Sequence, residues 1–151
     1  MSYQFYGHET KPVSPINKDF VKIKDQRHLY DLLSEIWCEY TCAPRMRDRW
    51  SKENKTCGQC SITAFLAQDI FGGEVYGVPL KDGNFHCFNK IDDVVFDLTS
   101  EQFDEILDYE HVILQKREAH FSKLEKYQRY LYLENKLKEK LDSIPHACSS
   151  L

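Results

Sequence analysis

The chain has 151 residues, a formal net charge of −4 at pH 7, 42% apolar residues and 13% aromatic residues. This length suits one domain with a hydrophobic core and is too short for two comfortable ones. The negative charge argues against nucleic acid or an anionic membrane as a partner. The sequence shows no secretory signal and no apolar run long enough to cross a bilayer, so we expect a cytoplasmic protein.

Six cysteines are a high number for a cytoplasmic chain of this length. In a reducing compartment they are more often buried, metal-bound or catalytic than paired in disulfides. No pattern in the sequence points to a cofactor. The cysteines are Cys38, Cys42, Cys57, Cys60, Cys87 and Cys148.

The distribution of apolar residues divides the chain into three parts. Residues 1–19 are polar and lack periodicity, which predicts a mobile or surface-draped arm. Residues 20–142 form the single predicted domain, and residues 143–151 a short tail.

Two amphipathic segments flank the centre of this domain. Asp25 can cap a helix whose apolar face continues to about Tyr40. A longer helix is expected over about Ser122 to Leu141, with Ser122 and Glu125 spaced as a capping box. We interpret its apolar face as core, with a coiled-coil seam as the alternative.

The centre of the domain is predicted as one helix followed by three antiparallel strands. Residues 60–71 are apolar on most sides, which indicates a buried helix that ends at Gly72-Gly73. Strands are predicted at residues 74–80, 84–91 and 94–98, because turn signals separate three short β-prone runs. The predicted fold class is therefore α+β.

Cys60 begins the central helix and is the candidate nucleophile. Unpaired N–H groups and the helix dipole favour a thiolate at a helix N-terminus. Gly58 permits a sharp turn before it, and the Gln59 amide is a candidate oxyanion donor. The alternative is that Cys60 is a buried cysteine with a structural role only.

His86 and Asp97 are predicted to share one face of the strand pair. If Asp92-Asp93 is a two-residue turn, Phe88 lies opposite Asp97. Side chains alternate along a strand, so His86 lies on the same face as Phe88 and therefore as Asp97. A register shift of one residue would separate them. Taken singly, His86 could be a structural histidine and Asp97 a helix cap.

These three residues together predict nucleophilic acyl transfer. The Cys60 thiolate would attack a carbonyl carbon, His86 would exchange protons, and Asp97 would hold the imidazole in the useful tautomer. The expected substrate carries an amide, ester or thioester in a peptide, a protein side chain or a small molecule. Peptidase, amidase, deamidase and acyl-transfer chemistry stay open, as does the oligomeric state.

Several short motifs lie between residues 58 and 103: Gly58-Gln59-Cys60, Thr63-Ala64, Gln68-Asp69, Phe71-Gly72-Gly73, His86 with Asn89, Asp97-Leu98-Thr99 and Gln102-Phe103. Together they resemble the bacterial YunG-like family of small cytoplasmic proteins, which is similar to papain-like cysteine hydrolases. The resemblance implies triad roles for Cys60, His86 and Asp97 and a cysteine-bearing helix packed on an antiparallel sheet, but no substrate. The position after His86 is Cys87, whereas the resemblance leads us to expect an aromatic residue there.

Three rival hypotheses remain open from the sequence. A zinc site could use the four thiols of Cys38, Cys42, Cys57 and Cys60, whose spacing suits four-thiolate coordination. A non-catalytic module could bind partners through the acidic segment 92–110 and the final helix. A disulfide switch could join Cys57 and Cys60.

One further segment, residues 45–55, holds five basic and two acidic residues. It is predicted either as a solvated loop or as a source of positive potential near Cys60 that favours an acidic substrate.

Overall fold

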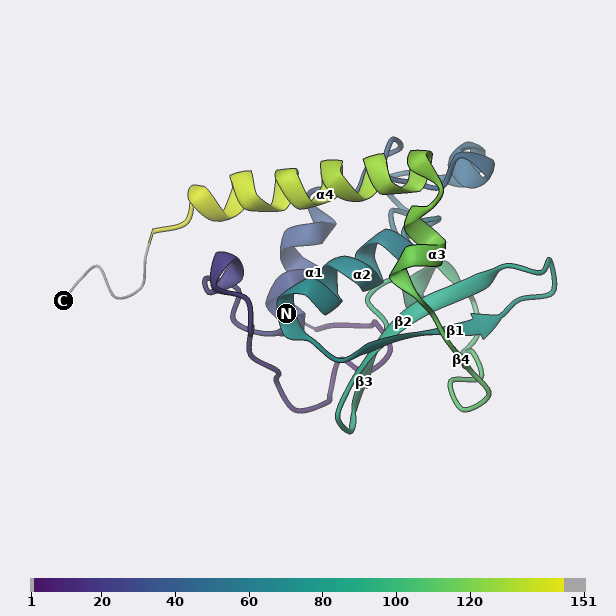
Figure 1. Ribbon diagram of the computed structural model, residues 1–151, viewed down its shortest axis with the longest axis horizontal. Helices are drawn as coiled ribbons and strands as arrows, with labels where there is room; N and C mark the ends of the chain where they lie inside the picture. Colours follow the sequence, from purple (N-terminus) through teal and green to yellow (C-terminus); the bar gives the residue numbers. More distant parts are fainter. Residues whose placement is uncertain (1, 146–151) are drawn as a thin grey trace.

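The computed structural model describes residues 2–145 and shows a mixed α+β arrangement in layers (Figure 1). Helix α2 (Cys60–Phe71) lies between strand β2 (Phe85–Ile91) and the long helix α4 (Leu124–Asp142), and α1 (Gln26–Ser34) packs against α4. The expected α+β class is confirmed. Most of the predicted tail, including Cys148, lies outside the described residues.

Helix α2 is the buried centre of the domain, as its composition predicts. An isolated apolar helix of this kind can only be stable with both sides covered, here by the sheet and by α4. Gly72 ends the helix at φ 85° and Gly73 follows at φ 76°. At Gly73 an added Cβ would lie 2.4 Å from the Lys90 carbonyl oxygen, so only glycine fits. The buried residues of α2 are Ile62, Thr63, Ala64, Phe65, Leu66, Ala67, Ile70 and Phe71.

The sheet has four antiparallel strands in the order β3-β2-β1-β4. The predicted three-stranded meander is present, with β1 at Glu74–Pro79 and β3 at Val94–Phe96. The edge strand β4 (Ile113–Leu114) was not predicted. It has only two residues, both exposed, so the alternating pattern that identifies a strand is absent.

The turn between β2 and β3 has the predicted register. Ile91 pairs with Val94 and Asn89 with Phe96, so Asp92-Asp93 is a two-residue turn. Asp92 takes φ 54°, a left-handed value that aspartate tolerates better than most residues. Continued by one residue, this register sets Asp97, the residue after β3, opposite Phe88. Asp97 therefore lies on the same face of the sheet as Phe88 and His86.

Helix α1 is shorter than its apolar periodicity predicts. Asp25 caps it as expected, accepting a hydrogen bond from the His28 N–H, but the helix ends at Ser34 and not near Tyr40. Trp37 turns into the core and donates through Nε1 to Thr63 Oγ1 at 3.0 Å. The Thr41 hydroxyl hydrogen-bonds the Cys38 N–H and carbonyl, which competes with continued helix formation.

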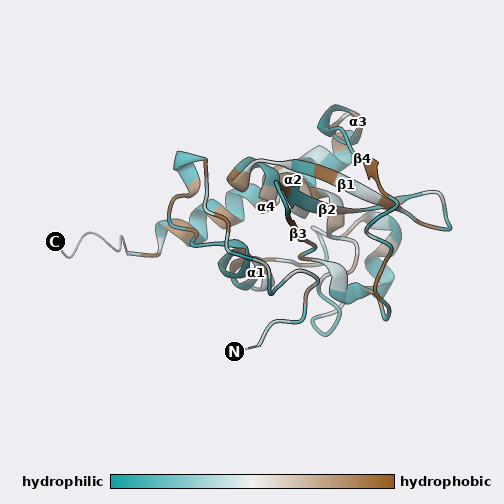
Figure 2. Cartoon of the chain, turned by 90° about the horizontal axis from the view of Figure 1, so that it is seen from below, coloured by the Kyte–Doolittle hydropathy of each residue, from teal (hydrophilic) through white to brown (hydrophobic). Residues whose placement is uncertain are grey.

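The final helix begins at Leu124, two residues later than predicted, and the prediction of a capping box at Ser122 is wrong. Ser122 closes the short helix α3 (Arg117–Phe121), and its hydroxyl donates to the Ala119 carbonyl. Leu133, Leu137 and Leu141 of α4 are buried, and hydrophilic and hydrophobic residues alternate along this helix (Figure 2). Among residues 2–145, no helix combines the length and apolar content needed to cross a bilayer.

The N-terminal arm is irregular, as expected, but it is anchored in the core. The Phe5 side chain has no exposed surface and packs against Tyr3 and Tyr30. The Tyr6 carbonyl accepts a hydrogen bond of 2.9 Å from the Asp97 N–H. The arm therefore lies directly against one of the predicted site residues.

The buried Phe5 gives a test of whether the arm belongs to the folded unit. We expect Phe5→Ala to lower the free energy of unfolding by about 3 kcal/mol, because it empties a fully buried aromatic site. The control is Ile16→Ala in the same arm, where the side chain is 75% exposed and the expected change is below about 0.5 kcal/mol. Urea unfolding of both variants measures this, and equal midpoints would contradict the anchoring.

Candidate active site

The turn before Cys60 requires glycine for two reasons. Gly58 has φ 70°, in the left-handed region. An added Cβ would also lie 2.5 Å from Cys42 Sγ and 2.9 Å from the Ala43 nitrogen. The Gly58 N–H donates to Gln102 Oε1 at 3.2 Å, and its carbonyl accepts from the Ala43 N–H at 2.9 Å. The turn is thereby held in one conformation against the rest of the domain.

Cys60 is the first residue of α2, at the end of the helix that carries partial positive charge. The N-cap residue, Gln59, makes no side-chain capping hydrogen bond, so the first N–H groups of the helix stay available. Hydrogen bonds from Cys87 and from His86 lower the pKa of Cys60 well below its usual range, against the opposing effect of burial. The geometry therefore favours a thiolate at Cys60.

Cys87 has the largest effect in lowering the pKa of Cys60. Its buried thiol has a pKa raised well above the usual range, by its hydrogen bond to Cys60 and by burial. A thiol that stays protonated can donate to a neighbouring thiolate. Cys87 therefore supports the Cys60 thiolate and does not compete with it as a nucleophile.

His86 and Asp97 form a buried hydrogen-bonded pair. His86 Nε2 lies 2.7 Å from Asp97 Oδ2, and both side chains are 1% exposed. Burial disfavours the imidazolium, but the Asp97 carboxylate and the Cys60 thiolate outweigh it and raise the pKa of His86 to about 10. Because Asp97 occupies Nε2, Nδ1 is the nitrogen left for Cys60. The structure thus brings the three predicted residues together.

Asp97 is held by Thr99, which belongs to the Asp97-Leu98-Thr99 motif, and by Tyr109, which the sequence did not indicate. The Tyr109 hydroxyl donates to Asp97 Oδ2 at 2.6 Å, and the Thr99 N–H donates to Oδ1 at 3.2 Å. The Tyr109 ring stacks on Tyr6 of the arm with centroids 3.9 Å apart. Phe103 packs edge-on against the His86 ring at 4.7 Å. No motif at Tyr109 or Tyr6 would have signalled these contacts.

Gln59 and Asn89, predicted to support the site, have other partners. Gln59 is fully buried, and one N–H of its Nε2 donates to the Cys38 carbonyl at 3.1 Å. Asn89 Nδ2 donates to the Ala64 carbonyl at 2.8 Å, which ties β2 to the middle of α2. Both bonds tie together the elements that carry the site.

A cleft of about 700 Å³ opens at the start of α2 and includes Cys60 and His86 in its lining. One wall comes from residues 43–49, and another from α3 and the first turns of α4. On that second wall, Lys126 Nζ lies 2.9 Å from His120 Nδ1, and His120 Nε2 lies 2.8 Å from Gln115 Oε1. These cleft residues were not predicted, because nothing local in the sequence relates them to Cys60.

The four thiols of the zinc hypothesis do not meet in one place. Cys42 hydrogen-bonds Cys57, Cys38 lies near the Thr41 hydroxyl, and Cys60 contacts His86 and Cys87. Within residues 2–145, no group of three or more His, Cys, Asp or Glu side chains is arranged to hold a metal ion. The five cysteines in that range are free thiols.

Comparison with known proteins relates this site to a family. The family model described as YunG protein matches residues 25–142. The chain belongs to the YunG family. It is 32% identical over 117 residues, covering 78% of this chain and 95% of the relative, to the "Uncharacterized protein YunG" of Bacillus subtilis (strain 168). No solved structure matches the chain. The YunG match includes Cys60, His86 and Asp97, whereas the arm that contacts Asp97 precedes it.

The lowered pKa of Cys60 predicts how its alkylation depends on pH. The rate follows the thiolate fraction, so iodoacetamide should modify Cys60 rapidly well below the ordinary thiol pKa of about 8.5. Replacing His86 by alanine removes the positive partner and should raise the midpoint by about two pH units. Mass spectrometry of each cysteine measures this, with buried Cys87 as the internal control. A midpoint for Cys60 near 8.5 in the wild type would contradict the assignment.

The raised pKa of His86 predicts the effect of Asp97. In Asp97→Asn the carboxylate that stabilises the imidazolium is lost while burial remains, so the pKa of His86 should fall by two units or more relative to the same background with Asp97 intact. Proton NMR titration in a Cys60→Ala background measures this without the coupled thiol. The matched control is Asp93→Asn in the exposed turn, and an equal pKa in both variants would refute the pairing.

Proposed function

We propose that this protein is a papain-like cysteine hydrolase or acyl transferase with Cys60, His86 and Asp97 as its catalytic triad. One observation supports this most strongly: a buried His86–Asp97 pair, 2.7 Å apart, beside a cysteine at a helix N-terminus that opens on a cleft. Burying an ionisable pair is costly unless each group has a partner, so such a pair inside a cleft is typical of an active site.

The proposed reaction has two steps. The Cys60 thiolate attacks the carbonyl carbon and forms a C–S bond. The tetrahedral intermediate then collapses, the bond to the leaving group breaks, and the His86 imidazolium protonates the departing amine or alcohol. In the second step water, or an amine or thiol acceptor, attacks the thioester and gives its proton to His86. The Cys60 thiolate is regenerated, and the acyl group leaves as an acid or as the transfer product.

The backbone supplies the proposed oxyanion donor. The Cys60 N–H lies at the open start of α2, whereas one N–H of the buried Gln59 amide is already bonded to the Cys38 carbonyl. An N–H group at a helix N-terminus stabilises negative charge and needs no rearrangement during the reaction. Asp97 does not exchange protons in this scheme and keeps the imidazole oriented.

The proposed substrate is an amide, ester or thioester on a peptide, a protein side chain or a small molecule. The cleft volume is that of a site for a small ligand or for a single side chain with its neighbouring backbone. The proposal includes a reducing, cytoplasmic environment, because the mechanism depends on a free thiol at Cys60.

Acyl-enzyme trapping tests this function without a known substrate. We expect p-nitrophenyl esters to release nitrophenol in a burst and to leave one acyl group on Cys60, visible by mass spectrometry as a hydroxylamine-sensitive adduct. Cys60→Ser and His86→Ala should each reduce the rate by about a thousandfold or more. Cys38→Ser is the matched control with wild-type kinetics. Acylation of other cysteines, with none on Cys60, would refute the proposal and favour a non-catalytic binding module.

A further inference from the structure

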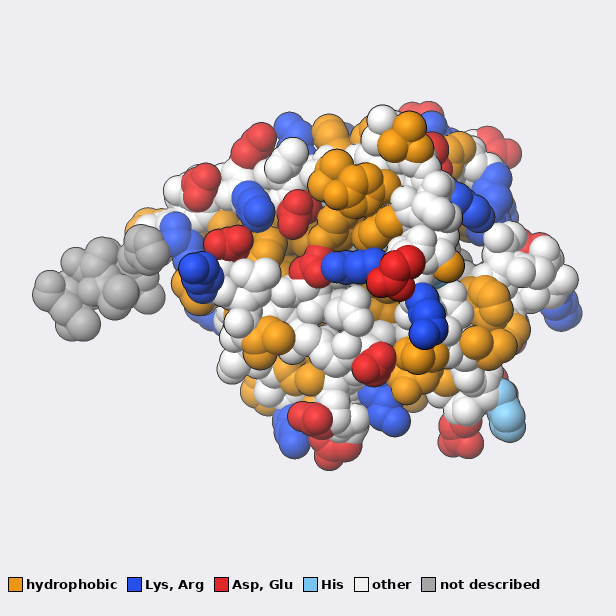
Figure 3. Space-filling view, in the orientation of Figure 1, with side chains coloured by type: hydrophobic (Ala, Val, Ile, Leu, Met, Phe, Trp, Pro, Cys, Tyr) orange, Lys and Arg blue, Asp and Glu red, His pale blue; other side chains and the backbone are white. Residues whose placement is uncertain are grey.

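The cleft is basic although the whole chain is acidic. Five basic and two acidic side chains line it, whereas the chain carries a net charge of −4. Figure 3 shows Lys and Arg side chains gathered near the end of the molecule where residues 44–49 and the start of α4 lie in Figure 1. The predicted positive potential near Cys60 therefore comes from two separate segments of the chain.

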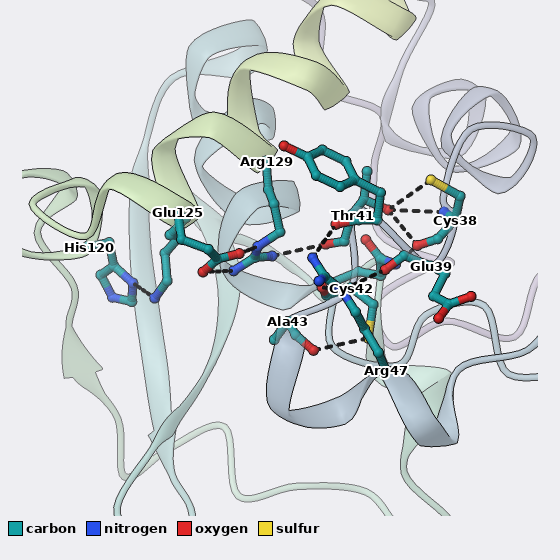
Figure 4. A network of polar contacts seen from close by, with 12 residues as sticks. Cys38, Glu39, Thr41, Cys42, Ala43, Arg47, His120, Glu125 and Arg129 are labelled. Atoms are coloured by element: carbon teal, nitrogen blue, oxygen red, sulfur yellow. Dashed lines mark hydrogen bonds and ion pairs between the residues drawn. The ribbon is translucent and has the colours of Figure 1, made fainter.

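Two of the five cations are already neutralised. Arg45 lies 3.6 Å from Asp82 across the cleft. Arg129 forms an ion pair with Glu125 and donates to the Thr41 carbonyl at 2.9 Å (Figure 4). Asp82 and Glu125, the two acidic residues of the cleft, are therefore both engaged in ion pairs.

The three remaining cations are Arg49, Lys123 and Lys126, and within residues 2–145 none has a carboxylate within 4 Å. Arg49 and Lys123 are exposed, so water solvates them. Lys126 is half-buried, and its pKa is lowered by burial, against the opposing effect of the nearby thiols. Of the three, only Lys126 is a partly desolvated positive charge, and it has no carboxylate partner.

Lys126 is held in place by a short chain of hydrogen bonds. Burial, with the neighbouring Lys126 charge, lowers the pKa of His120 to about 4, so this imidazole is neutral at pH 7. His120 Nε2 lies against Gln115 Oε1, an oxygen that can only accept a hydrogen bond, so the proton of the neutral imidazole is on Nε2. Nδ1 is therefore unprotonated and accepts a hydrogen bond from the Lys126 ammonium. Arg117 fixes the helix that carries His120, through Asp69 at 2.7 Å and the Phe65 carbonyl at 3.1 Å.

We propose that Lys126 binds a carboxylate or equivalent anionic group on the acyl substrate of Cys60. This rests on the proposed function and adds the substrate class. A neutral imidazole is an uncharged acceptor, so it orients the ammonium and leaves its charge and remaining donors for a ligand. Because Lys126 and Cys60 line the same cleft, one ligand can place its anionic group at Lys126 and its reacting carbon at Cys60.

Two alkylating reagents of nearly equal size test this inference. Iodoacetate carries a carboxylate next to its reacting carbon, and iodoacetamide carries a neutral amide. Both rates at Cys60 depend on the same thiolate fraction, so the ratio of iodoacetate to iodoacetamide rates isolates the preference for an anion. We expect this ratio to fall by about tenfold or more in Lys126→Met and Lys126→Gln, and to be largely retained in Lys126→Arg.

The matched control is Lys136→Met, on the same helix about 15 Å further along, where the ratio should stay at the wild-type value. An unchanged ratio in both Lys126→Met and Lys126→Gln, with rapid iodoacetamide alkylation, would overturn the anion site and leave the proposed function standing. Slow wild-type alkylation of Cys60 by iodoacetamide would instead overturn the proposed function itself. The two failures are therefore distinct.

Discussion

The buried contact between His86 and Asp97 is the interaction on which the rest of the site depends. Two ionisable groups with 1% exposure are tolerated only if each offsets the desolvation of the other. Asp97 Oδ2 receives both the imidazole and the Tyr109 hydroxyl, and its other oxygen receives the Thr99 N–H. The paired carboxylate keeps the imidazolium stable, and the imidazolium in turn favours a thiolate at Cys60. The function that we propose depends on both of these electrostatic effects, the one of Asp97 on His86 and the one of His86 on Cys60.

The layers of the fold place the three groups within reach of one another. The two-residue turn at Asp92-Asp93 brings His86 and Asp97 to one face, and Asn89, on the opposite face of β2, bonds to the Ala64 carbonyl of α2. This bond sets the position of α2 along the strand and therefore the position of its first residue. Gly58 lets the chain enter the helix close to Cys42 without a steric clash. Contacts to the backbone of α2 and of the turn before it thus set the position of Cys60, and its own side chain does not.

The parts that could be predicted were those encoded by local patterns. The buried helix at 60–71, its glycine stop and the β2–β3 register all follow from composition, turn chemistry and alternation, which operate over a few residues. The C-terminal end of α1 could not be predicted. The chain departs from the helix before Trp37, whose side chain hydrogen-bonds Thr63, a residue 26 positions away. Likewise the bond from the Gln59 amide to the Cys38 carbonyl could not be predicted, because the fold brings together two residues that are 21 positions apart.

The sequence by itself determined the α+β class, the cysteine at a helix start and the common face of His86 and Asp97, because each depends on near neighbours in the chain. Only the tertiary structure decided which distant groups complete the site. Tyr6 and Tyr109 come to Asp97, Cys87 contacts Cys60, and Lys126 enters the cleft through packing of segments far apart in the chain. Such contacts arise from the packing of separate elements around a buried core, and no periodicity in the sequence records them.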